Sequence, residues 1–198
     1  MNNSKKKYMK IFLSVLILIF SIQSWSEADD IRDFEIEGIS IDDSLLNYMT
    51  ANEIRNNTLP YFEDERNYYI VLKNTNLKTF DRIELYLKSR DNDYVIKGIQ
   101  AGIFPNTLEK CLKEKKKIEK DIENSLNIKL EDLVEKHSFY VNTTLYSSFY
   151  YFGLDYIRIN CTYYDDKDKK VHGASLMDNL SVSAYTNEIN KWFQSGYN

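Results

Sequence analysis

The chain has 198 residues, of which 43% are hydrophobic and 28% are charged, so it has the length and apolar content for one folded domain. Only 2 prolines and 6 glycines are present, which excludes collagen-like and low-complexity classes. The net charge of -4 provides no basic surface for phosphates, so we expect no nucleic-acid partner.

The first 28 residues have the pattern of an export signal. Lys5, Lys6, Lys7 and Lys10 precede an apolar run from Ile11 to Ile22. As a helix this run covers about 18 Å, which is short of the roughly 30 Å hydrocarbon core of a bilayer. A cleaved signal peptide is therefore favoured over an anchor helix, which is the alternative.

The cleavage site is predicted from two small residues. Ser26 and Ala28 occupy the two positions that a signal peptidase reads, so we place the cut between Ala28 and Asp29. The mature chain is then 29–198, and no other segment reaches 18 consecutive apolar residues. We expect a periplasmic or secreted protein without a membrane span after cleavage.

The start of the mature chain predicts short elements. Residues 33–39 alternate in hydrophobicity around a glycine, which is typical of a short strand and turn. A helix is expected to start at Asp42 or Asp43. Thr50 is followed three residues later by a glutamate, which is capping-box spacing and predicts a second short helix from Ala51.

The next segment changes to a period of two residues. Tyr68–Lys73 is a β-prone run, and in Phe80–Lys88 apolar and polar residues alternate. Turn residues then lead into Tyr94–Phe104, so the last two strands should form a hairpin. Gly98 and Gly102 indicate a bulge or a close helix crossing.

A long amphipathic helix should follow, with Asn106 as its cap and Leu126 near its end. Its lysine run over 115–117 is surrounded by acidic residues, which favours a solvated, self-neutralised face over a site for anions.

Strand character returns after a less regular segment near Leu130. Alternation predicts strands over 139–145 and 157–161, joined as a hairpin by a turn near 152–155. The remaining predicted elements are a polar connection over 165–170, a strand over 180–184 and a terminal helix capped by Thr186.

The order of these elements defines the expected fold class. The mature chain reads as helix, three strands, long helix, three strands and helix, without a solenoid repeat or an internal linker. We therefore predict a single two-layer α+β domain, in which an antiparallel sheet of about six strands carries the long helix on one face.

The two cysteines predict a disulfide. Cys111 lies on the apolar stripe of the long helix, and Cys161 shares the parity of the buried residues on its strand. In an exported chain with an even number of cysteines a bridge is the expected state. Two separate buried thiols are the alternative.

Catalytic and metal-binding patterns are sparse. Cys111 with His137, or Cys161 with His172, would need an exposed thiolate of low pKa, whereas both thiols are expected to be buried. Two histidines exclude a three-histidine metal site, and the acidic run from Asp165 lacks the glycine and final glutamate of an EF-hand loop. We predict no catalytic residue, metal site or cofactor.

One set of residues suggests a ligand surface. Tyr140, Tyr146, Tyr156 and Tyr164 share the outward parity of two neighbouring predicted strands, so a ligand surface is expected there rather than near His137 or His172. Tyrosines on a solvated sheet can stack on sugar rings or anchor a peptide. The alternative is that tyrosine simply suits a solvated pleated surface.

Several segments resemble one family. They are the run DDIRDFEIEGISIDDSLLNYMT from Asp29 to Thr50, TLEKCLKEKKKI, IRINCTYY and a terminal N-x-x-x-x-W-F. Their order and spacing are similar to those of an uncharacterised family of small exported proteins of SAR11-type marine alphaproteobacteria. Members usually have glycine where this chain has Asp42, which implies a modified turn there. The resemblance supports export and implies no activity.

These observations rank three classes of function. We expect an exported periplasmic protein that acts as a binding or interaction module without enzymatic activity, with an envelope protein or a small ligand as its partner. An envelope-assembly accessory protein is the first alternative. A small hydrolase is ranked last, because no nucleophile, base and orienting group occur in a recognisable set.

Overall fold

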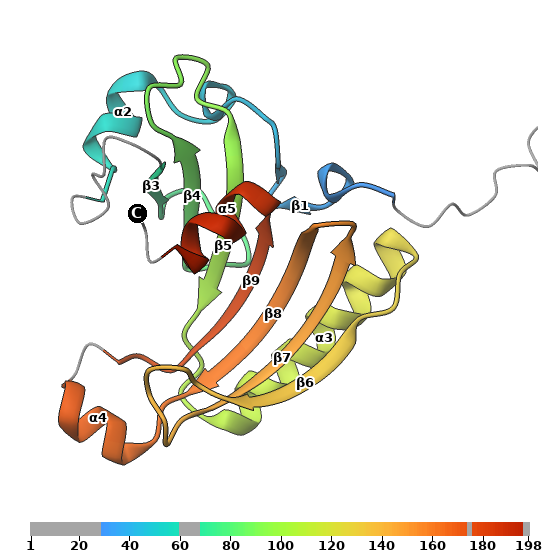
Figure 1. The fold of residues 1–198 in the computed structure, drawn as a ribbon, viewed down its shortest axis with the longest axis vertical. Helices are drawn as coiled ribbons and strands as arrows, with labels where there is room; N and C mark the ends of the chain where they lie inside the picture. The colour runs from blue at the N-terminus through green and yellow to red at the C-terminus, as the bar shows by residue number, and fades with distance from the viewer. Residues whose placement is uncertain (1–28, 60–67, 174–175, 196–198) are drawn as a thin grey trace, which may run out of the picture.

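The computed structural model describes residues 29–59, 68–173 and 176–195. Within these residues a seven-stranded antiparallel sheet has the order β3-β4-β5-β9-β8-β7-β6 (Figure 1). Its strands are β3 (Tyr68–Lys73), β4 (Arg82–Lys88), β5 (Ile96–Ile103), β6 (Glu131–Lys136), β7 (Thr144–Phe152), β8 (Asp155–Tyr163) and β9 (Asn179–Tyr185). The predicted signal peptide, with Ala28 at its end, lies outside the described residues.

Helices cover both sides of the sheet. The 19-residue helix α3 (Leu108–Leu126) packs on β8 and β9, whereas α5 (Asn187–Gln194) lies on the opposite side, against β5 and β9 (Figure 1). The smaller elements are η1 (Ile31–Asp33), β1 (Glu35–Ile36), β2 (Ile39–Ser40), η2 (Leu45–Asn47), α2 (Ala51–Asn56) and α4 (Asp166–His172). The α+β class with a long helix on an antiparallel sheet is confirmed, with one strand more than expected.

The two sides of the sheet bury different clusters. On the side of α3, which we call the helix face, the main core includes Leu85, Ile99, Ile159 and Val182. On the other side, which we call the open face, α5 covers a smaller cluster. Its buried members are Tyr68, Ile70, Tyr86, Tyr185, Ile189 and Trp192. Alternate side chains of β4 belong to the two clusters, as expected for a strand that is covered on both faces.

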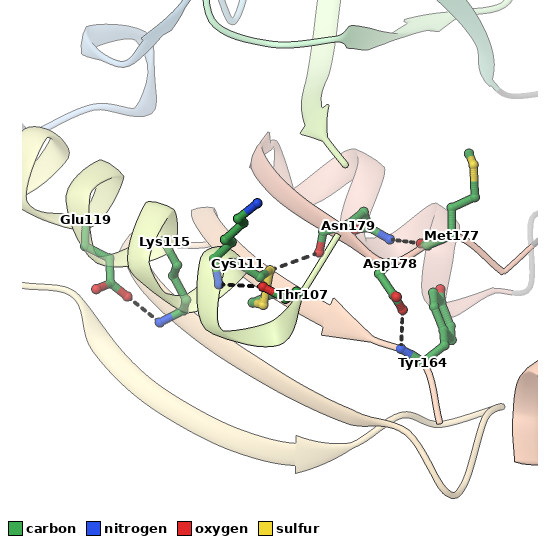
Figure 2. Close-up of a disulfide and its surroundings, with 10 residues drawn as sticks. Thr107, Cys111, Lys115, Glu119, Tyr164, Met177, Asp178 and Asn179 are labelled. Carbon is green, nitrogen blue, oxygen red and sulfur yellow. Dashed lines mark hydrogen bonds and ion pairs between the residues drawn. A yellow bond between two sulfur atoms is a disulfide. The ribbon is translucent and has the colours of Figure 1, made fainter. Parts of the chain in front are cut away.

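The predicted disulfide is confirmed. Cys111 on α3 and Cys161 on β8 form an S–S bond of 2.02 Å with a Cα–Cα distance of 5.9 Å (Figure 2). Both cysteines are buried, and the Sγ atom of Cys111 also contacts the carbonyl oxygen of Asn179 at 3.5 Å. The bridge thus ties the long helix to the centre of the sheet, as a domain in an oxidising compartment allows.

Helix starts agree with the sequence at α2 and differ by one residue at α3. Thr50 and Glu53 form the expected capping box. At α3 the cap is Thr107 rather than Asn106, because Thr107 has extended backbone angles and its hydroxyl accepts the N–H of Lys110 at 3.2 Å. Both residue types cap well, so the backbone conformation decides between them.

The helix predicted from Asp42 or Asp43 is absent. The N–H of Asp42 donates to the carbonyl of Ile96, and the N–H of Ile96 donates to the carbonyl of Asp43, both at 2.9 Å. This pairing with the start of β5 uses the backbone groups that a helix would need, and only the 3₁₀ turn η2 follows. Asp42 has a left-handed φ of 68°, a conformation that aspartate tolerates better than most residues.

The strand predicted over 139–145 begins only at Thr144. His137 Nδ1 accepts the backbone N–H groups of Phe139 at 3.1 Å and Tyr140 at 3.3 Å, and the N–H of Thr143 donates to Tyr140 O. These bonds close a turn between β6 and β7, so the apparent alternation there belongs to a loop.

The polar connection predicted over 165–170 instead contains α4. Asp165 accepts the N–H of Lys167 at its N-terminus. Acidic residues lie in the first turn and basic residues in the last, which suits the helix dipole. The prediction of a polar connection was therefore wrong, and the order of acidic before basic residues is the signal in the sequence that it overlooked.

Candidate functional site

The open face carries a row of tyrosines across four strands. Tyr86 on β4 pairs with Gly98, Gly98 with Tyr185 on β9, Tyr185 with Tyr156 on β8, and Tyr156 with Tyr151 on β7. Ring centroids are 5.4 Å apart for Tyr86 and Tyr185, 5.7 Å for Tyr185 and Tyr156, and 5.8 Å for Tyr156 and Tyr151. These distances are typical of attractive aromatic pairs.

Gly98 makes this row possible. A Cβ atom at Gly98 would lie 2.9 Å from Cδ1 of Tyr185 and 3.2 Å from Cβ of Tyr86. The missing side chain lets the rings of Tyr86 and Tyr185 meet edge to face over the β5 backbone. The sequence indicated a bulge or a close crossing at Gly98. The register of β4 and β5 does shift between Tyr86 and Leu87, and aromatic rings provide the close contact.

A row of polar side chains runs beside the tyrosines. Glu84, Gln100, Ser183 and Arg158 are direct cross-strand neighbours on β4, β5, β9 and β8. The Tyr185 hydroxyl donates to Gln100 Oε1 at 2.5 Å, and the amide of Gln100 donates to Glu84 Oε2 at 3.3 Å. The polar atoms of the row are therefore connected to the phenols of the tyrosine row.

Burial keeps the inner phenols protonated. It is the main cause that raises the pKa of Tyr86 and of Tyr185 above the ordinary value. The Tyr86 hydroxyl consequently stays a donor, to Glu84 Oε2 at 3.2 Å. Glu84 also pairs with Arg82 at 3.3 Å, and the Arg82 guanidinium lies 5.2 Å from the ring centroid of Phe104.

A hollow of about 720 Å³ lies over these groups. Its lining includes Leu72, Arg82, Glu84, Gln100, Tyr164 and Phe193. Its size lies within the 300–1,000 Å³ typical of small-molecule sites, and its lining combines apolar walls with a few convergent polar groups. This hollow is the candidate binding site.

The four tyrosines selected from the sequence do not form one surface, which corrects that prediction. Tyr156 lies in the tyrosine row, and Tyr164 lines the hollow. Tyr146 pairs with Cys161 and therefore lies on the helix face, packed against the main core. Tyr140 lies in the β6–β7 turn. Once residues 137–143 form a turn, the parity inferred from 139–145 no longer applies to β7.

The histidines also lie closer to the tyrosines than expected. The ring centroid of Tyr140 is 4.6 Å from that of His137, 5.1 Å from that of His172 and 5.3 Å from that of Tyr164. A ligand surface was expected on the tyrosines rather than near either histidine, yet the Tyr140 ring lies beside both histidines, because α4 folds back onto the β6–β7 turn. Asp168 holds this contact: it accepts Asn142 Nδ2 at 2.8 Å and the Thr143 hydroxyl at 2.7 Å.

Sequence reasoning missed the residues at the centre of the site, which are Tyr86, Tyr185, Glu84 and Gln100. The alternation of Phe80–Lys88 already placed Glu84 and Tyr86 on one face. Tyr185 joins them because β9 lies beside β5 in the sheet. The alternation of apolar and polar residues within a strand does not predict which strands are neighbours.

Lys115 on α3 and Ser148 on β7 form a buried lysine–serine pair on the helix face. Lys115 Nζ contacts Glu119 and Ser148, and lies 3.3 Å from Asp132 (Figure 2 shows Lys115 and Glu119). The Ser148 hydroxyl also donates to Asp132 at 2.6 Å. Ser148 is 0% exposed, so a substrate cannot reach its hydroxyl. The network ties α3 to β6 and β7.

A second hollow of about 680 Å³ lies between α3 and the β1–β2 hairpin. Its lining includes Phe34, Phe80, Ile118 and Ile122. The Glu37 carboxylate accepts the backbone N–H groups of residues 78–80, so it is already occupied. Without a connected polar set, this hollow is the weaker candidate.

Comparison with protein-family models, curated proteins and solved structures finds no match for this chain. Among the described residues no group of three or more His, Cys, Asp or Glu is placed to hold a metal ion. None of the helices in the same part of the chain combines the length and apolarity needed to cross a bilayer. The resemblance to the marine family stays a prediction.

Proposed function

We propose that the protein is an exported binding protein of the periplasm, and that it holds a small organic ligand in the hollow of the open face. The observation that carries this proposal is the hollow itself, where apolar walls meet Arg82, Glu84 and Gln100. The Cys111–Cys161 bridge supports an extracytoplasmic compartment, because such bonds persist where the surroundings are oxidising.

The lining defines the chemistry of the ligand. Leu72 and Phe193 provide apolar contact for a flat or branched hydrocarbon part. Arg82 carries donors and Glu84 carries acceptors, and they are held 3.3 Å apart. The apolar body of such a ligand would contact Leu72 and Phe193. One polar group on the ligand would accept a hydrogen bond from Arg82 and donate one to Glu84.

Native mass spectrometry tests the proposal. The protein is mixed with the small-molecule fraction of an envelope extract, and we expect a bound mass. Arg82→Gln removes the positive charge and most of the N–H donors, and Leu72→Arg places a charged side chain in the apolar wall. Each substitution should weaken binding at least about fivefold, because a contact of this kind contributes more than about 1 kcal/mol.

Arg32→Gln is the matched control. Arg32 is also an arginine paired with a neighbouring acid, Asp30, but it lies on η1, outside the hollow. The Arg32→Gln variant should bind the same ligand as strongly as the unchanged protein. Absence of any bound mass, or equal binding by the Arg82 and Leu72 variants, would contradict the proposal.

A further inference from the structure

Among the described residues the seven-stranded sheet has two border strands, and a neighbouring segment covers one of them, β3. At β3, the N–H of Leu59 donates to Ile70 O at 2.8 Å and the N–H of Leu72 donates to Asn57 O at 2.9 Å, so the segment before β3 occupies that edge. At β6, no described strand lies on the outer side. Leu133 and Val134 on β6 are 40% and 63% exposed.

The hydrogen-bond pattern shows which groups of β6 point outward. The N–H of His137 donates to Thr143 O at 3.0 Å, so these residues form a hydrogen-bonded pair of the β6–β7 ladder. Antiparallel ladders alternate such pairs with pairs whose backbone groups face away. The N–H and C=O groups of Asp132, Val134 and Lys136 therefore point away from β7.

We propose that this edge pairs with the same edge of a second copy of the chain, in an antiparallel two-fold arrangement centred on Val134. A two-fold axis places the same strand on both sides of the interface, so the strand must be complementary to itself. An exposed strand edge is a ready template for such pairing.

Charge selects the register. Centred on Val134, the pairing sets Asp132 opposite Lys136 of the second copy on both sides of a Val134–Val134 contact. A centre at Leu133 would oppose Glu131 to Glu135, and a centre at Glu135 would oppose two copies of Glu135. Opposite charges across strands stabilise and like charges destabilise, so only the central register is self-complementary.

Both charged groups are in place for this contact. The Asp132 side chain is 82% exposed, and the hydrogen bond from Ser148 is the largest cause that lowers its pKa, so it is ionised at neutral pH. Lys136 Nζ donates to Asn142 O and Thr144 Oγ1, both at 3.1 Å, and an ammonium has three protons. The third proton is available to a carboxylate opposite.

Sedimentation equilibrium from about 10 μM to about 1 mM, a range that detects weak association, tests the proposal. We expect the mass to rise from one chain towards two. Asp132→Lys alone opposes lysine to lysine, and Lys136→Asp alone opposes aspartate to aspartate, so each variant should stay monomeric. A 1:1 mixture of the two variants restores both opposite-charge pairs and should form mixed dimers.

Val134→Pro separates pairing from folding. Proline removes an N–H that points outward, so the ladder to β7 remains intact and the variant should keep its melting temperature while it loses the dimer. Val171→Ala on α4 changes another exposed valine, with 77% of its surface accessible, and should leave the dimer unchanged.

Three outcomes would overturn the proposal. They are a single-chain mass at every concentration, a dimer that survives Val134→Pro, and folded charge variants that stay monomeric when mixed. Circular dichroism of each variant identifies folding failure, and if Asp132→Lys unfolds because it disturbs Lys115, Val134→Pro decides alone.

Discussion

Breaking the Cys111–Cys161 bond should lower the stability of the domain substantially. The bond joins residues separated by 50 positions. On the chain-entropy relation a loop of this length corresponds to about 4 kcal/mol at 25 °C. For a domain of this size each kcal/mol changes the melting temperature by roughly 2–4 °C, so the expected decrease is roughly 8–16 °C.

Two perturbations distinguish the crosslink from the packing of the sulfur atoms. Reduction with a phosphine opens the bond and keeps both sulfurs in the core. The Cys111→Ala/Cys161→Ala variant removes the sulfurs as well, and should melt lower still because it leaves a cavity next to Ile159 and Leu180. Thermal melting followed by circular dichroism, with thiol alkylation to verify the redox state, measures both.

The comparison between reduced and oxidised protein is decisive. If the fully reduced protein melts within about 2 °C of the oxidised form, the crosslink does not constrain the unfolded chain as the relation requires. If the alanine variant melts like the reduced protein, the buried sulfurs contribute little beyond the bond.

Two further predictions concern the open face and the β6–β7 turn. Gly98→Ala should destabilise the domain by about 1–3 kcal/mol, because the new methyl group overpacks against Tyr185 and Tyr86. Gly102→Ala is the control on the same face of β5 and should leave the stability unchanged, because the nearest atoms to its Cβ lie at 3.9 Å. Equal melting temperatures of the two variants would refute this prediction. The stability of the domain should also decrease as the pH is lowered. Burial lowers the pKa of His137 in the folded protein, so below the ordinary histidine pKa of about 6.5 the unfolded chain binds more protons than the folded one. At lower pH Asp168 adds to this loss, since the hydrogen bonds from Asn142 and Thr143 outweigh burial and lower its pKa. His137→Asn keeps an acceptor for the two turn N–H groups without titrating, so the melting temperature should vary less between pH 7.5 and about pH 5; an unchanged slope would contradict the role of His137.

Local patterns were sufficient for much of the fold. The alternation of Phe80–Lys88 identifies a strand because its side chains are divided between two faces, and the capping box at Thr50 starts a helix through contacts three residues apart. The parity of Cys111 and Cys161 pointed to the same layer, and the bond exists. These features depend on neighbours along the chain, so the sequence alone determines them.

The site depended on contacts that no local pattern contains. Residues 139–145 alternate in hydrophobicity like a strand. Hydrogen bonds to the ring nitrogen of His137 and to the carboxylate of Asp168 nevertheless hold the first part of this segment in a turn. The strand therefore starts later, and Tyr146 lies on the helix face. Tyr86 and Tyr185 meet only because β9 inserts between β5 and β8, about 100 residues from β4 in the sequence. Sequence periodicity assigns side chains to faces, whereas the order of the strands decides which side chains become neighbours, and that order is set by the packing of the whole sheet.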